Sequence, residues 1–238
     1  GWRIFGGLLG AVAGVILMVH PILGAIVTIA FQYYLLAFTA MVIGHPTAAW
    51  DTHELSYLVR TGRMSSMLLR PILPLWKSLA GNLAYKVCTL AFVAPMWIVV
   101  YFLVRPEFNG DLWQVVVGIV ATILGFALNY CLTYVIALIS FWATKLDAVG
   151  EVYFALTMFL GGRFVPLQAI PQPYRLIAEA LPFRYLACFP VELLTGRMTD
   201  PVAILRNFIG VLAWLVVSIL AFRMLWAAAV RRYTAVSG

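Results

Sequence analysis

The chain has 238 residues, of which 64% are hydrophobic and only 11% are charged. Soluble domains carry about 25% charged residues, so this composition argues against a soluble enzyme, and it excludes a disordered chain. The formal net charge of +7 indicates cytosolic loops beside anionic lipid rather than a nucleic-acid site. We therefore expect an all-α membrane protein with no nucleic-acid partner.

The N-terminal segment is long enough for two membrane spans. No charged residue occurs from Ile4 to Ile43, and a single helix of that length would be about 60 Å long, twice the hydrocarbon thickness. Proline cannot continue a helix, so the chain is expected to fold back at His20-Pro21. The predicted spans are Arg3–Val19 and Ile22–Ile43. Because the chain starts at Gly1 without a methionine, we expect an N-terminal cytosolic segment to be missing.

Three later segments are also long and apolar enough to cross a bilayer. The third span is predicted over Leu79–Val104, and a polar turn separates it from a fourth span over Leu112–Ala143. The last span is predicted over Ile204–Ala227, with arginines on both sides. A weak excess of lysine and arginine on one side favours cytosolic termini and a cytosolic Gly44–Ser78 loop.

The segment between the fourth and last spans breaks this pattern. A polar connection is expected over Lys145–Gly150, and the apolar stretch Val152–Gly162 after it is too short for a regular span. Three closely spaced prolines follow, so the helix must break in or near the membrane interface. We expect an irregular fifth span, six spans in all, and short amphipathic helices over Tyr174–Leu181 and Phe183–Thr195.

The loop between the second and third spans contains an amphipathic helix. Asp51 can cap it, with Glu54 at the capping-box position, and Gly62 is a plausible end. One face is apolar and the other mostly polar, with Leu55, Leu58 and Val59 on the first and Asp51, His53, Ser56, Arg60 and Thr61 on the second. A second short turn begins at Met64. The helix either anchors the loop in the membrane surface or docks a soluble partner.

Several stretches, in the same order along the chain, resemble the ABC type-2 permeases, the membrane subunits of bacterial ABC exporters. Leu58–Leu75 resembles the family's "I-R-x-G…L-L-R-P" stretch, and Gly161–Pro171 its "G-x-x-x-P-L…P" break. Leu181–Gly196 is similar to its "L-P-F-x-Y…P-x-x-x-L-x-G" stretch, and Arg231-Arg232-Tyr233 to its closing motif. The resemblance runs from about Tyr33 to Tyr233 and is greatest to the subgroup that includes drug and lipophilic-cation exporters.

The resemblance implies half of an ATP-driven exporter in the bacterial cytoplasmic (inner) membrane. It implies one permease domain over 1–238, a cytosolic coupling-helix region over 50–70 and re-entrant outer helices over 161–200. Two permeases, identical or homologous, would pair, and each would dock one of two ATP-binding subunits. The residues that this places at the coupling surface are Asp51, His53, Glu54, Tyr57, Arg60, Arg63 and Met64.

Polar residues within the spans are candidates for lining a substrate pathway. One row of polar residues lies on a face of the second span. A second row lies on a face of the fourth span and extends to Ser140. The candidates are Thr28, Gln32, Tyr33, Asn129 and Thr133. The alternative is that they form helix–helix hydrogen bonds, which contribute about 0.6 kcal/mol on average.

The irregular region supplies a candidate outer gate. Its expected residues are Gly161, Gly162, Pro166, Pro182 and Glu192. Glu192 either holds the gate through a nearby arginine, Arg184 or Arg197, or is a solvated surface acid.

The motifs of an enzyme are absent from this sequence. It contains no G-x-x-x-x-G-K-[ST], so ATP and magnesium are expected to bind a partner subunit, and no cofactor is expected in this chain. His45, Asp51 and His53 are too loosely spaced to predict a metal site, and the three cysteines are expected to be buried. The alternatives to a permease are a non-transporting membrane scaffold and an ion-coupled carrier, although the spans hold no paired carboxylates for the latter.

Overall fold

The computed structural model describes residues 51–70, 72–104, 111–142, 147–162, 167 and 171–232. Residues 1–38 and 39–238 form two structural units, and all the described residues belong to the second. Every element among them is helical, which confirms the all-α class. The elements are α3 (Asp51–Arg60), α4 (Met64–Leu68), α5 (Pro74–Val104), α6 (Leu112–Leu138), η1 (Ile139–Phe141), α7 (Asp147–Leu160), α8 (Tyr174–Ala180), η3 (Pro182–Leu186), α9 (Cys188–Leu194) and α10 (Pro201–Arg232).

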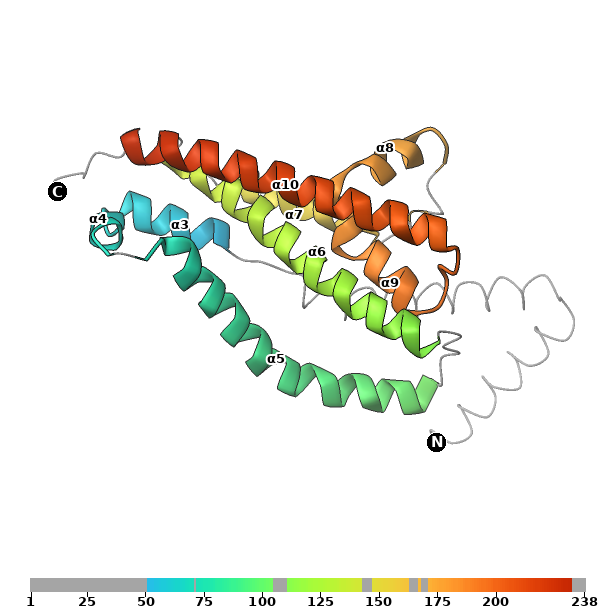
Figure 1. Ribbon diagram of the computed structural model, residues 1–238. Helices are drawn as coiled ribbons and strands as arrows, with labels where there is room; N and C mark the ends of the chain where they lie inside the picture. Colours follow the sequence, from blue (N-terminus) through green and yellow to red (C-terminus); the bar gives the residue numbers. More distant parts are fainter. Residues whose placement is uncertain are drawn as a thin grey trace, which may run out of the picture. The chain divides into compact units, whose positions relative to one another are not determined.

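Two helices of the described region are long and apolar enough to cross a membrane. Leu112–Phe141, which is α6 continued by η1, has a mean hydropathy of 2.2, and α10 reaches 2.3. The two helices pack along each other (Figure 1). At the start of α6, the Asp111 amide donates to Gln114 Oε1 at 2.9 Å, which satisfies one exposed amide of the first turn.

Most predicted helices are present, but several ends differ. α5 begins at Pro74, before the predicted Leu79, and it is bent in Figure 1. It also contains Pro95, which cannot donate a backbone hydrogen bond within the helix. α7 begins at Asp147, so the expected polar connection over Lys145–Gly150 is wrong in its last four residues. α10 extends beyond the predicted Ile204–Ala227 at both ends. The first two predicted spans lie outside the described residues.

The region before α10 also departs from its prediction in one place. α8 coincides with the expected amphipathic helix and stops before Pro182, as proline requires. The expected single helix over Phe183–Thr195 is instead divided into η3 and α9 at Ala187, whose backbone is not helical. This division turns the chain between two short helices and brings both against α6.

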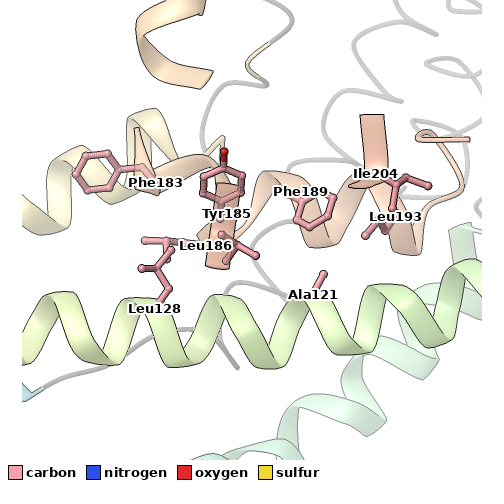
Figure 2. Close-up of a cluster of buried hydrophobic side chains, with 9 residues drawn as sticks. Ala121, Leu128, Phe183, Tyr185, Leu186, Phe189, Leu193 and Ile204 are labelled. Atoms are coloured by element: carbon pink, nitrogen blue, oxygen red, sulfur yellow. The ribbon is translucent and has the colours of Figure 1, made fainter. Parts of the chain in front are cut away.

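Two buried apolar clusters hold the helices together. The α3 cluster joins α3, α4, α6 and α10, and it consists of Leu55, Met64, Tyr130, Tyr134, Ala137, Leu138 and Ala229. The α9 cluster joins α6, η3, α9 and α10, and Figure 2 shows side chains of η3 and α9 facing α6. Its members are Ala121, Leu128, Phe183, Tyr185, Leu186, Phe189, Leu193, Ile204 and Val211. Since α6 and α10 contribute to both clusters, they connect the two regions.

Candidate docking surface and gate

The α3–α4 pair is fastened to the long helices by one apolar face. Leu55 is almost fully buried and Met64 is completely so, both within the α3 cluster. Gly62 separates the two helices with φ +71°, a conformation that glycine adopts without strain, which confirms the predicted helix end. The pair therefore forms a fixed attachment to α6 and α10 rather than a loose loop.

The opposite side of α3 presents charged and aromatic side chains to solvent. Glu54, Tyr57, Arg60 and Arg63 are exposed, and Tyr57 keeps 47% of its surface accessible. The Arg63 guanidinium lies over the Tyr57 ring, 5.6 Å from its centre. Lys77 Nζ of α5 is 3.9 Å from Glu54 Oε1, and both side chains are half exposed. We call Glu54, Tyr57, Arg60 and Arg63 the docking face.

One residue expected on the polar face of α3 and one expected at the coupling surface are buried instead. Ser56 is only 1% exposed, although the helical pattern predicted it beside Arg60. Met64 was expected at the coupling surface, but its complete burial in the α3 cluster prevents direct contact with a docked protein. The backbone of Asp51 and His53 lies in α3, while their side chains, and His45, are outside the described part of the chain.

The end of α7 is closed by two glycines. The helix stops at Leu160, as the sequence predicts, and Gly162 follows with φ +75°. A Cβ on Gly162 would lie 3.2 Å from Cys188 Cβ, so a larger residue would meet α9. Gly161 is buried at the same turn, and Pro182 is buried at the start of η3. Pro166, the remaining predicted gate residue, lies outside the described residues.

A chain of ion pairs links α8, η3 and α9. Arg175 Nε is 2.8 Å from Glu179 Oε1, and Arg184 Nη1 is 3.1 Å from the same oxygen. The other terminal nitrogen of Arg184 donates to Glu192 Oε2 at 3.1 Å. Glu192 is 7% exposed, which rules out a solvated surface acid. Of its two predicted partners, the structure pairs it with Arg184, while Arg197 is exposed.

The carboxyl group of Glu179 is stabilised in its charged form. Burial by itself would raise its pKa, but the hydrogen bond from Arg175 and the positive charges of Arg184 and Arg175 outweigh it. The net result is a pKa below the ordinary value. Glu179 therefore joins the two arginines as a carboxylate.

Two close contacts in this region were not predicted. A Cβ on Gly118 of α6 would lie 2.6 Å from Leu194 Cγ of α9, and one on Gly210 of α10 would lie 2.1 Å from Tyr185 Oη of η3. Glycine at these positions lets the long helices approach α9 and η3 closely. Neither contact follows a local sequence motif, because each partner belongs to a distant element.

The polar stripe of α6 lies in the protein interior. Asn129 and Thr133 are both buried; the Tyr153 hydroxyl of α7 donates to Asn129 Oδ1, and Thr133 Oγ1 donates to the Asn129 carbonyl at 2.7 Å. The Tyr153–Asn129 bond joins two helices and supports the alternative of helix–helix hydrogen bonding, whereas the Thr133 bond lies within α6. The pathway role stays a prediction. Thr28, Gln32 and Tyr33 lie outside the described residues.

The described residues contain no group of three or more potential metal ligands. The expectation of three buried cysteines is correct for Cys188, but Cys131 is only partly buried and Cys88 is exposed on α5.

Comparison with known families decides the class of protein. The family model described as "ABC-2 family transporter protein" matches residues 15–237. The chain belongs to the ABC-2 transporter family. No curated protein and no solved structure matches it. ABC-2 permeases are generally membrane subunits without catalytic activity that pair with ABC ATP-binding subunits. This membership confirms the resemblance at the level of the family, and the apolar α6 and α10 agree with a membrane protein.

Proposed function

We propose that the protein is the permease subunit of an ATP-driven exporter and that its docking face binds the ATP-binding subunit. One observation carries the proposal: α3 exposes Glu54, Tyr57 and Arg60 on one side, and on the other it packs on α6 and buries Leu55 in the cluster to which α10 also contributes. A protein that presses on the exposed side thereby acts on two membrane-capable helices at once.

The long helices provide a route for transmitting that movement. The 27 residues of α6 extend about 40 Å at 1.5 Å per residue, and the helix contributes to both apolar clusters. α10 likewise contributes Ala229 to the α3 cluster and Ile204 to the α9 cluster. Displacement of their α3 ends would therefore reach η3 and α9. Coupling of this kind requires two states with different contacts at the docking face.

In this proposal the segment from α8 to α9 is the outer gate, and six spans form half of the pathway. A second permease, identical or homologous, supplies the other half, and each permease docks one ATP-binding subunit. The membrane is the bacterial cytoplasmic membrane, with both termini in the cytosol. The aromatic content of 14% suits an apolar or cationic substrate, in keeping with the drug and lipophilic-cation exporters.

Charge reversal on the docking face tests the proposal. The chain would be co-expressed with each candidate ATP-binding subunit, purified and reconstituted in vesicles. Glu54→Arg and Arg60→Glu should reduce co-purification of the ATP-binding subunit or uncouple its ATPase activity, without loss of folded permease. Arg197→Glu is a matched control, because Arg197 is exposed but belongs to the loop before α10.

The possible outcomes separate the candidate functions. Loss of coupling in both α3 variants, with the control unchanged, supports the exporter. Unchanged ATPase stimulation in every variant would refute the docking face. A partner that binds but drives no transport would favour a scaffold, and transport that survives ATP depletion but collapses with a protonophore would favour an ion-coupled carrier.

A further inference from the structure

A groove lies where α4 ends and α5 begins. Its volume is about 370 Å³, and it is open to the surface. Met67, Ile72, Leu73 and Trp76 supply apolar walls, and Arg70 and Lys77 supply two cationic groups. The groove adjoins the docking face, because Lys77 lines the groove and pairs with Glu54, but it contains none of the four residues of that face and none of the ion-pair chain from Arg175 to Glu192.

The walls of the groove suit an amphiphilic molecule. Trp76 is 57% exposed, and Ile72 and Leu73 are also exposed, which is unfavourable in water but ordinary at the border of a membrane. Tryptophan is enriched at this border, and long basic side chains there extend their charged ends towards the headgroups. A ligand with one anionic end and one apolar end would satisfy both kinds of side chain.

The local charges favour an anion. Residues 51–78 contain four basic side chains and two acidic ones, so the segment has a net charge of +2. Glu54 approaches Lys77 only to 3.9 Å, and an ion pair between half-exposed side chains is weak. A phosphate that enters the groove can therefore compete for Lys77 as well as bind Arg70.

The apolar end of the groove continues along α5. Trp76, Leu83, Val87 and Leu90 are exposed at spacings of seven, four and three residues, so they share one face of the helix. From the first to the last, this stripe extends about 21 Å. The predicted third span over Leu79–Val104 would place most of this stripe in the hydrocarbon, where an acyl chain can lie along it and a soluble protein cannot. A free phosphate would leave the stripe uncovered.

We propose that the groove binds an anionic phospholipid of the leaflet beside α3 and α4. Its phosphate lies between Arg70 and Lys77, and its acyl chains cover Leu73, Trp76 and the stripe on α5. Basic pockets beside membrane helices bind anionic headgroups in this way. Family membership implies the membrane but does not assign this site.

Lipid binding can be measured on the full chain. The purified protein would be exposed to equal amounts of phosphatidylglycerol and phosphatidylcholine, and the retained lipid counted by native mass spectrometry. We expect preferential retention of one phosphatidylglycerol. Because each cation near a membrane surface contributes roughly a factor of five, Arg70→Gln/Lys77→Gln should weaken retention by more than about tenfold. Arg197→Gln/Arg206→Gln removes the same charge elsewhere and should leave retention unchanged.

A second measurement tests the acyl-chain end. Phosphatidylglycerol with brominated acyl chains should quench tryptophan fluorescence, and Trp76→Phe should remove part of that quenching. Millimolar inorganic phosphate should not displace the lipid. Equal retention of both lipids, displacement by phosphate, or equal losses in the two double variants would overturn the proposal. Unchanged lipid binding together with loss of the ATP-binding subunit in Arg70→Gln/Lys77→Gln would assign the groove to protein docking instead.

Discussion

The α3 and α9 clusters share α6 and α10, but different contacts surround them. Beside the α3 cluster, Glu54 and Lys77 form an exposed ion pair at 3.9 Å, and the docking face remains open. Beside the α9 cluster, Arg184, which is 12% exposed, connects the partly exposed Glu179 with the buried Glu192, and the absence of a side chain at Gly210 lets the Tyr185 hydroxyl lie close to α10. One region presents contacts that another molecule can replace, whereas the other pairs its charged groups with one another.

The difference indicates how easily the contacts of each region can be broken. Contacts on the docking face cost little to break, because water already solvates half of each side chain. Around α9, opening the segment would separate buried charges and expose tightly packed rings, so the contacts must be lost together. If this segment is the outer gate that we propose, such packing favours two discrete arrangements over a continuous range.

The largest expected effect comes from removing Arg184. Arg184→Leu would remove the Arg184–Glu192 ion pair, whose side chains are only 12% and 10% exposed, and breaking a buried pair costs about 3 kcal/mol or more. Unfolding of the purified protein in mixed micelles, titrated with denaturant, would measure this loss. Arg184→Lys should lose less, because lysine keeps the charge but cannot contact both acids with a planar fork.

Arg175→Leu is the matched control for Arg184→Leu. Arg175 also pairs with Glu179, but it is more exposed, and Glu179 retains Arg184 after the change. The expected loss is less than about 1 kcal/mol. Equal losses of stability for Arg175→Leu and Arg184→Leu would mean that the greater burial of Arg184 does not increase the contribution of its ion pairs.

An intermediate effect is expected at the contact between α10 and η3. Gly210→Ala would place Cβ 2.1 Å from Tyr185 Oη, and the Tyr185 ring is itself packed edge-on against Phe189. Overpacking of this kind costs about 1–3 kcal/mol, partly offset by the better helix propensity of alanine. The same denaturant titration applies, and Tyr185→Phe should restore part of the loss by removing the hydroxyl.

Gly81→Ala provides the comparison, because a Cβ on Gly81 would meet nothing within 4 Å. This change should be neutral or should stabilise α5 by up to about 1 kcal/mol. If alanine were tolerated equally well at positions 81 and 210, the close approach of α10 and η3 would not contribute to stability.

Local signals in the sequence predicted the helix breaks well. Gly62 and Gly162 adopt the left-handed backbone that favours glycine, and α8 stops before Pro182 because proline disfavours helical geometry in the preceding residue. The amphipathic character of α3 was also evident. Its pattern did not predict the burial of Ser56, since a small hydroxyl side chain fits against neighbouring helices that the sequence of α3 does not reveal.

Contacts between elements that are distant in the sequence could not be predicted from it. Arg184 and Arg197 lie eight and five residues from Glu192, so spacing alone could not choose between them. The choice depends on the fold: η3 brings Arg184 back to α9, whereas the turn at Gly196 leaves Arg197 in solvent. The close approach of Gly210 to Tyr185 likewise depends on two elements meeting in space.

The smallest expected effect is at the exposed pair of α3 and α5. Glu54→Gln and Lys77→Gln should each change the free energy of unfolding by less than about 1 kcal/mol, because both groups remain half solvated. A double-mutant cycle would isolate their interaction, and high salt should abolish it, since ions screen exposed charges. A coupling as large as that between Arg184 and Glu192 would contradict the contrast between the two regions, because the exposed pair would then contribute to the fold as strongly as the buried one.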